Sequence, residues 1–218
     1  MRDEKIKYID KLINDLKVVD YMEHDVVCAT SFIKIKSGNY KLNNGETIER
    51  ERVTKRNGYM NAVVICAVTL DKDIAMVVQP RVFLPGDKKV TIEMPAGYLN
   101  KDERVLDAAA RELLEETGYV GDKFYLVDSY YPSLGYSGES ISIVLATGCK
   151  KEKEQDLDSD EYINYFTANI EEIRWMIKNK YIVDATTKLA FYEVIDYLKN
   201  NNMLDIIEVN DEKEEKKK

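Results

Sequence analysis

The feature that most restricts the fold is the segment Gly97–Tyr119, which reads GYLNKDERVLDAAARELLEETGY. Its second half carries apolar residues at helical spacing, which predicts one buried stripe on an α-helix. These residues are Leu106, Ala109, Ala110 and Leu113. Gly118 follows where a helix commonly ends on a left-handed residue. The segment therefore predicts a helix that packs on the rest of the fold and stops at a glycine.

Three glutamates of this helix, Glu112, Glu115 and Glu116, share an arc of about 100° beside the stripe. Carboxylates crowded in this way repel one another unless a cation neutralises them. Oxygen ligands suit hard divalent cations such as Mg2+ or Mn2+. Arg111 precedes the three glutamates and can neutralise or orient one of them. Taken alone, the letters ELLEE also fit a solvated acidic helix face.

The spacing around these glutamates favours the metal interpretation. Gly97 is followed by five residues, then Glu103, seven further residues and RELLEETGY. This order matches every fixed position of the pattern G-x5-E-x7-R-E-U-x-E-E-x-G-U, the Nudix box. On these residues the chain resembles the Nudix hydrolase family.

The resemblance extends over roughly residues 62–185, and four further stretches are similar to the ADP-ribose pyrophosphatase branch. They are QPR at 79–81, EMPAG at 93–97, PSLGYSGE at 132–139 and DATT at 184–187. The resemblance implies an enzyme that splits the diphosphate of a nucleoside diphosphate sugar, converting ADP-ribose to AMP and ribose 5-phosphate. It also implies an α/β (α+β) fold, a Nudix-type α/β/α sandwich with a mixed sheet. A small N-terminal antiparallel sheet and an N-terminal helix are expected in addition.

In the resembled enzymes the glutamates of the motif hold two or three Mg2+ (or Mn2+) ions against the diphosphate. Carried over, Glu112 and Glu116 are direct ligands, and Glu115 binds directly or through water. The carbonyl oxygen of Ala96 is a further ligand, and Glu103 stays close as a secondary group. Cations are needed because a diphosphate is negatively charged and its cleavage adds charge on the leaving oxygen.

Glu139 is the candidate for the group that deprotonates or orients the attacking water. In the resembled branch a glutamate does this from a Gly/Ser-rich loop, and Glu139 lies in such a loop. Glu115 and Arg111 are expected to act with it in the catalytic site. Two alternatives stay open for Glu139, an ordinary exposed loop glutamate and a metal ligand.

Four positions are candidates for holding the substrate. Arg81 follows a strand and can clamp a phosphate through two parallel hydrogen bonds, and Arg52 is a second arginine of this kind. Glu93 is a candidate for the sugar side or for a partner subunit. The branch stacks its adenine on an N-terminal aromatic ring, here Phe32 or Tyr40. The alternatives are a surface arginine for Arg81, and core or sheet packing for the two rings.

The composition excludes other classes of protein. The chain has 218 residues, of which 33% are charged, and its net charge of −8 argues against a nucleic-acid surface. Its only histidine is His24, so a histidine triad or a zinc site is nearly excluded. No apolar run is long enough to span a membrane, and the charged start MRDEKIKYIDKL favours a cytoplasmic protein. Cys28, Cys66 and Cys149 lie in apolar or strand-like contexts and are expected to be buried free thiols.

The order of elements predicts three parts. Residues 1–56 form a helix and antiparallel strands for dimerisation and substrate capping, 57–205 form the catalytic domain, and 206–218 form a charged, disordered tail. The thin N-terminal sheet needs a partner surface, which together with the resemblance predicts a homodimer. Residues 150–161 are expected to form an exposed, mobile loop. Trp175 lies in a C-terminal helix beside Ile173 and Met176 and is expected to be a packing residue. Strands are expected at 26–36, 39–42, 47–55, 60–70, 74–79, 90–94, 124–131 and 140–147, and helices at 3–18, 170–177 and 186–201.

Two residues keep other functions open. Leu134 stands where the ADP-ribose branch usually has a proline, and Tyr136 lies close to a tyrosine of the family's diadenosine-polyphosphate hydrolases. A dinucleoside polyphosphate or other nucleotide pyrophosphohydrolase is therefore the enzymatic alternative. A non-catalytic ligand sensor is a second, although the intact glutamates argue against it. A plain interaction domain has only the N-terminal helix and the charged tail in its support.

Overall fold

The computed structural model describes residues 2–87, 89–159 and 161–207. The chain divides into two compact units, described separately below. The small unit comprises residues 1–60 and 133–139, and the large unit comprises residues 61–132 and 140–218.

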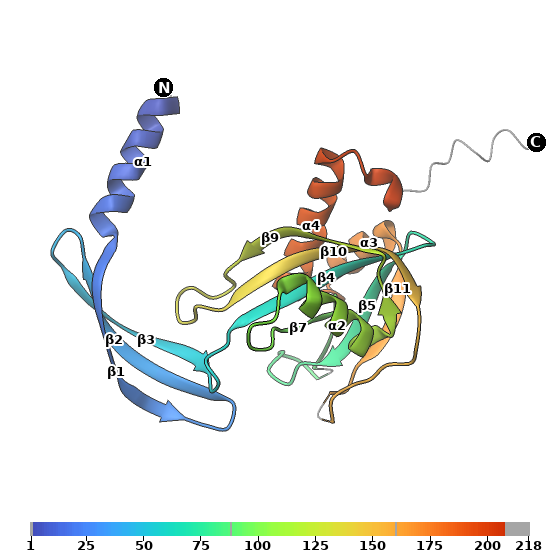
Figure 1. The fold of residues 1–218 in the computed structure, drawn as a ribbon, viewed down its shortest axis with the longest axis horizontal. Helices are drawn as coiled ribbons and strands as arrows, with labels where there is room; N and C mark the ends of the chain where they lie inside the picture. The colour runs from blue at the N-terminus through green and yellow to red at the C-terminus, as the bar shows by residue number, and fades with distance from the viewer. Residues whose placement is uncertain (1, 88, 160, 208–218) are drawn as a thin grey trace, which may run out of the picture. The chain divides into compact units, whose positions relative to one another are not determined.

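The small unit contains one helix and one antiparallel sheet (Figure 1). Its elements are α1 (Arg2–Leu16), β1 (Val18–Ala29), β2 (Ile33–Leu42) and β3 (Thr47–Lys55). The strands pair in the order β1-β2-β3. The single strand expected at 26–36 is divided between β1 and β2. The chain reverses there because the Thr30 N–H donates to the Ile33 carbonyl at 2.8 Å.

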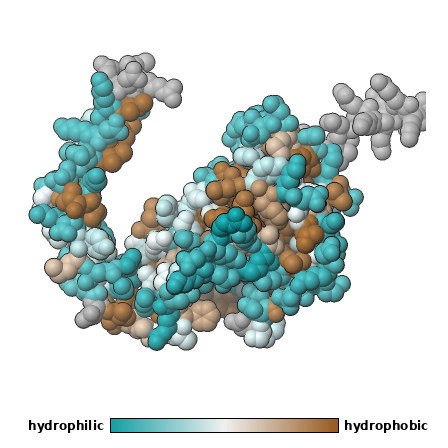
Figure 2. Space-filling view, viewed as in Figure 1, coloured by the Kyte–Doolittle hydropathy of each residue, from teal (hydrophilic) through white to brown (hydrophobic). Residues whose placement is uncertain are grey.

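Apolar side chains of the small unit are largely exposed. Figure 2 shows hydrophobic side chains along α1, where the amphipathic helix expected from the sequence is confirmed. The exposed apolar residues of this helix are Ile6, Ile9, Leu12, Ile13 and Leu16. Among the residues of this unit that the structure describes, Leu42 is the only buried hydrophobic one. A three-stranded sheet with so little core needs a further surface to bury its apolar residues.

The large unit is organised around an eight-stranded sheet. Its strands are β4 (Asn61–Thr69), β5 (Ile74–Pro80), β6 (Val90–Glu93), β7 (Ala96–Tyr98), β8 (Tyr119–Val120), β9 (Lys123–Tyr130), β10 (Ser140–Lys151) and β11 (Asn164–Ala168). The main path runs β11-β5-β4-β10-β8, with β6 paired to β5, β7 to β4 and β9 to β10. The β4–β10 pair is parallel and the other pairs are antiparallel. The sheet is therefore mixed, as expected.

Helices cover both faces of this sheet. They are α2 (Val105–Thr117), α3 (Ile170–Lys178), α4 (Ala185–Asn200) and the short 3-10 helix η1 (Leu204–Ile206). Successive residues of β4 point to opposite faces. Val63 and Ile65 pack in one cluster with Leu113 of α2, whereas Val64 packs in the other with Phe191 of α4. The α+β fold with helical layers on either side of a mixed sheet is thus confirmed.

Burial along α2 differs in part from the predicted stripe. Ala109 and Leu113 are buried as expected, but Leu106 is 37% exposed and Ala110 is only half-buried. Ala108 is buried in their place. The buried face of the helix is displaced toward the side that carries Glu112 and Glu116, which are themselves buried.

The C-terminal helices begin where the sequence predicts. The side chain of Asn169 accepts the Glu172 N–H at 3.0 Å, and the Glu172 side chain accepts the Asn169 N–H, which completes a capping box. Trp175 does not pack in the core: it is 55% exposed and stacks on Tyr181 with ring centroids 5.2 Å apart. Of the tail predicted from 206 onward, the structure describes only the first two residues, and the rest lies outside the described residues.

The three cysteines are free, as expected, but they are not all buried. Cys66 and Cys149 are buried, and burial raises the pKa of each thiol to about 12. Cys28 is exposed on β1, because the sheet of the small unit has little core to bury it. Within the described ranges, no helix combines the length and apolar character needed to cross a bilayer.

Candidate functional site

The candidate site is built around the connection between β6 and β7. Here Met94 and Pro95 carry the chain from its pairing with β5 to its pairing with β4. Hydrogen bonds from other elements fix this crossing. The Ile65 N–H of β4 donates to the Pro95 carbonyl at 2.8 Å, and the Ala96 N–H donates to Oε2 of Glu116 at 3.1 Å. The main chain of the connection is therefore held directly against α2.

Gly97 makes room for a second glutamate of α2. A Cβ atom at this position would lie 2.1 Å from Cδ of Glu112, so a larger residue would displace that carboxylate. Glycine is required here by close approach of β7 to the helix. This contact explains why the EMPAG stretch and the RELLEE stretch occur together in one sequence.

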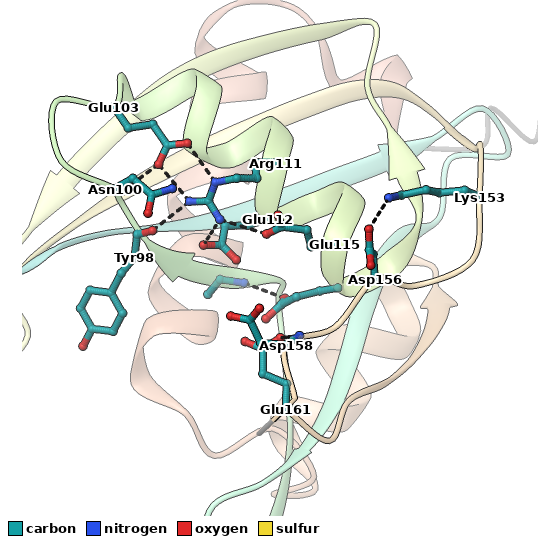
Figure 3. A network of polar contacts seen from close by, with 12 residues as sticks. Tyr98, Asn100, Glu103, Arg111, Glu112, Glu115, Lys153, Asp156, Asp158 and Glu161 are labelled. Atoms are coloured by element: carbon teal, nitrogen blue, oxygen red, sulfur yellow. Dashed lines mark hydrogen bonds and ion pairs between the residues drawn. The ribbon is translucent and has the colours of Figure 1, made fainter. Parts of the chain in front are cut away.

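Arg111 binds the carboxylates along the outer side of the site (Figure 3). Its Nη1 donates to Oε1 of Glu112 at 2.8 Å and to Oε2 of Glu115 at 2.9 Å. Its Nε and Nη2 donate to the two oxygens of Glu103, each at 2.9 Å. Nη2 also donates to the Tyr98 carbonyl at 3.0 Å. One guanidinium thus compensates three carboxylates and ties α2 to the segment that precedes it.

Burial decides the protonation of the glutamates. Glu116 is 3% exposed, and loss of solvation raises the pKa of its carboxyl to about 8. Burial also raises the pKa of Glu112, although Arg111 opposes the shift. By contrast, the hydrogen bonds from Arg111 hold the pKa of Glu103 below its usual value. The inner part of the site therefore gathers carboxylates that lack full positive compensation, which a divalent cation would supply.

A further carboxylate at the site comes from the loop between β10 and β11. Glu161 lies close to the α2 glutamates (Figure 3), and its charge contributes to the raised pKa of Glu112 and of Glu116. Its Oε2 accepts the Asp158 N–H at 3.1 Å, which orients the side chain. Sequence analysis missed Glu161, since it is one acid in a charged run and carries no local signal of its own.

The expectation for residues 150–161 is therefore only partly correct. Most of them are exposed, but β10 continues to Lys151, and the loop that follows is bound to the end of α2. Nε2 of Gln155 donates to the carbonyls of Glu116 and Ile163. These contacts are why a charged segment holds a defined position beside the site.

The donor set fits a hard divalent cation. It comprises the carboxylates of Glu112, Glu115 and Glu116 and the carbonyl of Ala96, all oxygen atoms of the kind that Mg2+ and Mn2+ prefer. In the described part of the chain, no three acidic, histidine or cysteine side chains already form a metal cage. Arg111 occupies oxygens of two of these glutamates, so a cation competes with its guanidinium for them.

Arg81 and Glu93 form a bidentate pair in the large unit. Nε of Arg81 donates to Oε1 of Glu93 at 2.8 Å, and Nη2 donates to Oε2 at 2.6 Å. Gln79 adds a hydrogen bond from Nε2 to the same Oε2 at 3.2 Å. These bonds to Glu93 raise the pKa of Arg81, and the charges of Asp184 and Glu116 contribute. The arginine predicted to hold phosphate thus lies within electrostatic reach of the α2 site, and its side chain is half exposed.

The remaining predicted residues belong to the small unit. Arg52 on β3 pairs through Nη2 with Oε1 of Glu23 on β1. The Glu139 N–H donates to Oγ of Ser137 at 3.1 Å, which orders the loop that carries it. That loop is joined to β3, where the Val53 N–H donates to the Tyr136 carbonyl at 2.8 Å. The role of Glu139 as the group that activates water stays a prediction.

The two candidate stacking rings have different surroundings. Phe32 is 69% exposed and borders a hollow of about 380 Å3 together with Lys55, Arg56 and other polar residues, so core packing is wrong for this ring. Tyr40 is half-buried and stacks on Tyr21 of the neighbouring strand with ring centroids 6.1 Å apart. Sheet packing therefore explains Tyr40, whereas Phe32 is available to a ligand.

The Arg111 network leads to a prediction about stability. In metal-free protein, Arg111→Met is expected to lower the free energy of unfolding by about 2 kcal/mol, because three carboxylates lose their shared donor. Urea denaturation in EDTA measures this. Arg104→Met is the matched control: within the described residues its side chain pairs only with Asp107, on an exposed helix end, so its loss should change little. Equal stability of the two variants would show that the network does not hold the helix.

Comparisons with known proteins extend over most of the chain. The family model described as the NUDIX domain matches residues 58–196. A protein of Bacillus methanolicus named methanol dehydrogenase activator is 36% identical over 159 residues, covering 72% of this chain and 82% of its own length. An ADP-ribose pyrophosphatase of Bacillus subtilis (strain 168) is 34% identical over 151 residues, covering 69% of this chain and 78% of its own length.

Similarity to solved structures supports the fold. A crystal structure of an ADP compounds hydrolase superposes with a TM-score of 0.69 and covers 87% of this chain and 97% of its own. At 19% sequence identity, this match concerns the fold alone.

Among the sequence relatives, an ADP-ribose pyrophosphatase of Saccharomyces cerevisiae is 25% identical over 166 residues, which cover 72% of each chain.

Proposed function

Because the chain belongs to the Nudix hydrolase family, we propose that it hydrolyses the diphosphate bond of a nucleoside diphosphate sugar. The proposed substrate is ADP-ribose, which yields AMP and ribose 5-phosphate. The observation that carries the proposal is the convergence of Glu112, Glu116 and the Ala96 main chain in one buried site. The relatives named ADP-ribose pyrophosphatase support the choice of substrate.

The proposed cofactor is Mg2+, with Mn2+ as a substitute and two or three ions per site. Nudix hydrolases generally use divalent cations, and the oxygen donors described above fit such ions. Glu112, Glu115, Glu116 and the carbonyl of Ala96 would hold them. When bound, the ions offset the charge of the diphosphate and lower the pKa of a coordinated water.

The protein's own residues supply the remaining steps. Arg111, itself bound to Glu103, holds Glu112 and Glu115 in place, so that their carboxylates face the substrate in a fixed arrangement. A general base is needed to take a proton from the attacking water. Glu161 is our first candidate because it lies beside the α2 glutamates in the same unit, and Glu139 is the second.

The proposed substrate-binding residues belong to both units, and each is assigned from the residues that surround it. Arg81, oriented by its pair with Glu93, supplies N–H donors to a phosphate oxygen. Phe32 supplies an exposed ring for the adenine, and Lys55 and Arg56 bring positive charge to the same hollow. Arg52, held by Glu23, is proposed as a further phosphate donor.

We also propose that the protein is a homodimer. The exposed apolar residues of α1 and the thin sheet of the small unit support this, since a second copy would bury them. Sedimentation velocity at micromolar concentration checks the assembly. A mass of 25.2 kDa, that of one chain, would contradict the proposal.

A substrate panel tests the proposed reaction. Turnover with Mg2+ is measured for ADP-ribose, a diadenosine polyphosphate, NADH and a GDP-sugar, with alkaline phosphatase added to release phosphate from the products. The highest kcat/KM is expected for ADP-ribose. A preference for the diadenosine polyphosphate would transfer the assignment to the alternative that Leu134 and Tyr136 leave open. No turnover of any of the four would favour a ligand sensor.

A further inference from the structure

A buried threonine of α4 contacts the connection that carries Ala96. Oγ1 of Thr187 accepts the Met94 N–H at 3.1 Å, and Thr187 is 1% exposed. Met94 is fully buried, so its N–H has no access to water as a substitute partner. The two residues are 93 positions apart in the chain, and only the tertiary fold brings them together.

This hydrogen bond falls where the sheet offers no partner. The registers of the two strand pairs stop at Glu93 on one side and resume at Ala96 on the other. Met94 and Pro95 therefore cross between strands, and proline has no N–H to donate. A buried main-chain N–H without a partner is unfavourable, so the hydroxyl of Thr187 stabilises this crossing.

The position of that hydroxyl is set by the start of α4. Oδ2 of Asp184 caps the helix by accepting the Thr187 N–H at 2.6 Å. One turn further, Ala190 and Phe191 are buried in the core beneath the sheet. The threonine is thus fixed both by its cap and by the packing of its helix.

Three elements consequently hold three successive residues. Thr187 of α4 binds the N–H of Met94, Ile65 of β4 binds the carbonyl of Pro95, and α2 binds the N–H of Ala96 through a glutamate. These bonds fix the peptides that precede the Ala96 carbonyl, and the pairing of Gly97 with Val63 of β4 holds the chain that follows it. The Ala96 carbonyl is therefore held from both sides.

We propose that Thr187 is a positioning residue of the cation site, which aims the Ala96 carbonyl by anchoring the Met94 amide. The inference rests on the proposed function, because it takes Ala96 as a ligand of the divalent cation. It gives the DATT stretch a physical role: Asp184 places the helix, and Thr187 connects it to the EMPAG stretch. Residues that orient metal ligands typically affect metal affinity about 10- to 100-fold when they are replaced.

The experiment measures binding of Mn2+ alone, without substrate, to the full chain by electron paramagnetic resonance. Thr187→Val keeps the shape of the side chain and removes the acceptor, Thr187→Ala removes the acceptor without adding bulk, and Thr187→Ser keeps it. Thr186→Val is the matched control, because among the described residues Thr186 makes no side-chain hydrogen bond. The Mn2+ dissociation constant is expected to rise about 10-fold for Val and Ala, and to stay near wild type for Ser and for the control.

The outcomes separate this inference from the proposed function. A lower melting temperature of the Val and Ala variants with unchanged Mn2+ affinity of the folded protein would mean a merely structural role and overturn the inference. If the Val variant does not fold, the Ala and Ser pair decides in the same way. Wild-type protein that binds no Mn2+ would overturn the proposed metal site and this inference with it. Weaker binding by both Val and Ala, restored by Ser, supports the inference even if the substrate differs from ADP-ribose.

Discussion

Replacement of Glu116 by glutamine is expected to reduce kcat at least about 100-fold in Mg2+ while the fold is kept. Glutamine has the same shape and can still accept the Ala96 N–H through its side-chain carbonyl. It lacks the negative charge that a divalent cation needs at this buried position. Steady-state turnover of ADP-ribose and far-UV circular dichroism measure the two effects. Glu154→Gln is the control, since Glu154 is an exposed glutamate of the loop and its charge should not matter.

In metal-free protein, the same substitution is expected to increase the stability of the fold. Burial raises the pKa of Glu116 to about 8 in the folded chain from its ordinary value of 4.5, so the folded state binds the proton more tightly. Stability is therefore lost as the pH rises from about 4.5 to about 8, by about 1 kcal/mol per pH unit. Glu116→Gln removes this loss. In EDTA, the melting temperature of the variant should exceed that of wild type by a margin that grows between pH 5 and pH 8.

Either half of this prediction can fail separately. Wild-type kcat for Glu116→Gln would exclude Glu116 as a cation ligand and with it the central part of the site. A difference in melting temperature that does not depend on pH would show that the buried carboxyl is compensated by a group other than a cation.

Replacement of Glu161 by glutamine is expected to lower kcat by about 100-fold or more, with KM changed only a few-fold. The reason is that a glutamine cannot accept the proton of the attacking water, whereas the loop keeps its contacts through Gln155. Initial rates with ADP-ribose over a range of concentrations separate kcat from KM. Asp156→Asn is a matched control on the same loop, because Asp156 is exposed and pairs with Lys153.

Glu139→Gln decides between the two candidate bases. If Glu161 is the base, Glu139→Gln should retain most of the wild-type kcat. A large fall in kcat for Glu139→Gln beside a nearly normal Glu161→Gln would return the role to Glu139, as the sequence predicts. Comparable losses in both variants would contradict the assignment of the base to Glu161 alone.

Local patterns predicted much of the large unit. The run over 60–70 is almost wholly apolar, and β4 is buried on both faces as such a run requires. The helix of the motif and its terminal glycine follow from the 3.6-residue period and from the freedom of Gly118, which has a φ of 70°. Asn169 likewise signals the start of α3. Each of these features depends on residues that are near neighbours in the chain.

Predictions of burial from the sequence were wrong where burial depends on which other element packs against the residue. Leu106 belongs to an apolar period but is exposed, and Trp175 is exposed although it has apolar neighbours in sequence. Cys28 lies in a strand, yet that strand belongs to a unit with almost no core. Periodicity shows which residues share a face, but only the packing of other elements decides which face is covered.

The sequence by itself determined the chemistry of the site, because the motif places three carboxylates within two turns of one helix and a glycine at a fixed distance before it. Tertiary structure decided which further side chains lie near the glutamates of the motif. Glu161, Thr187 and the Arg81–Glu93 pair come from strands, loops and helices that the mixed sheet brings together across long stretches of chain. The physical reason is that a helical period fixes neighbours a few residues apart, whereas contacts between distant residues follow from the order in which strands pair.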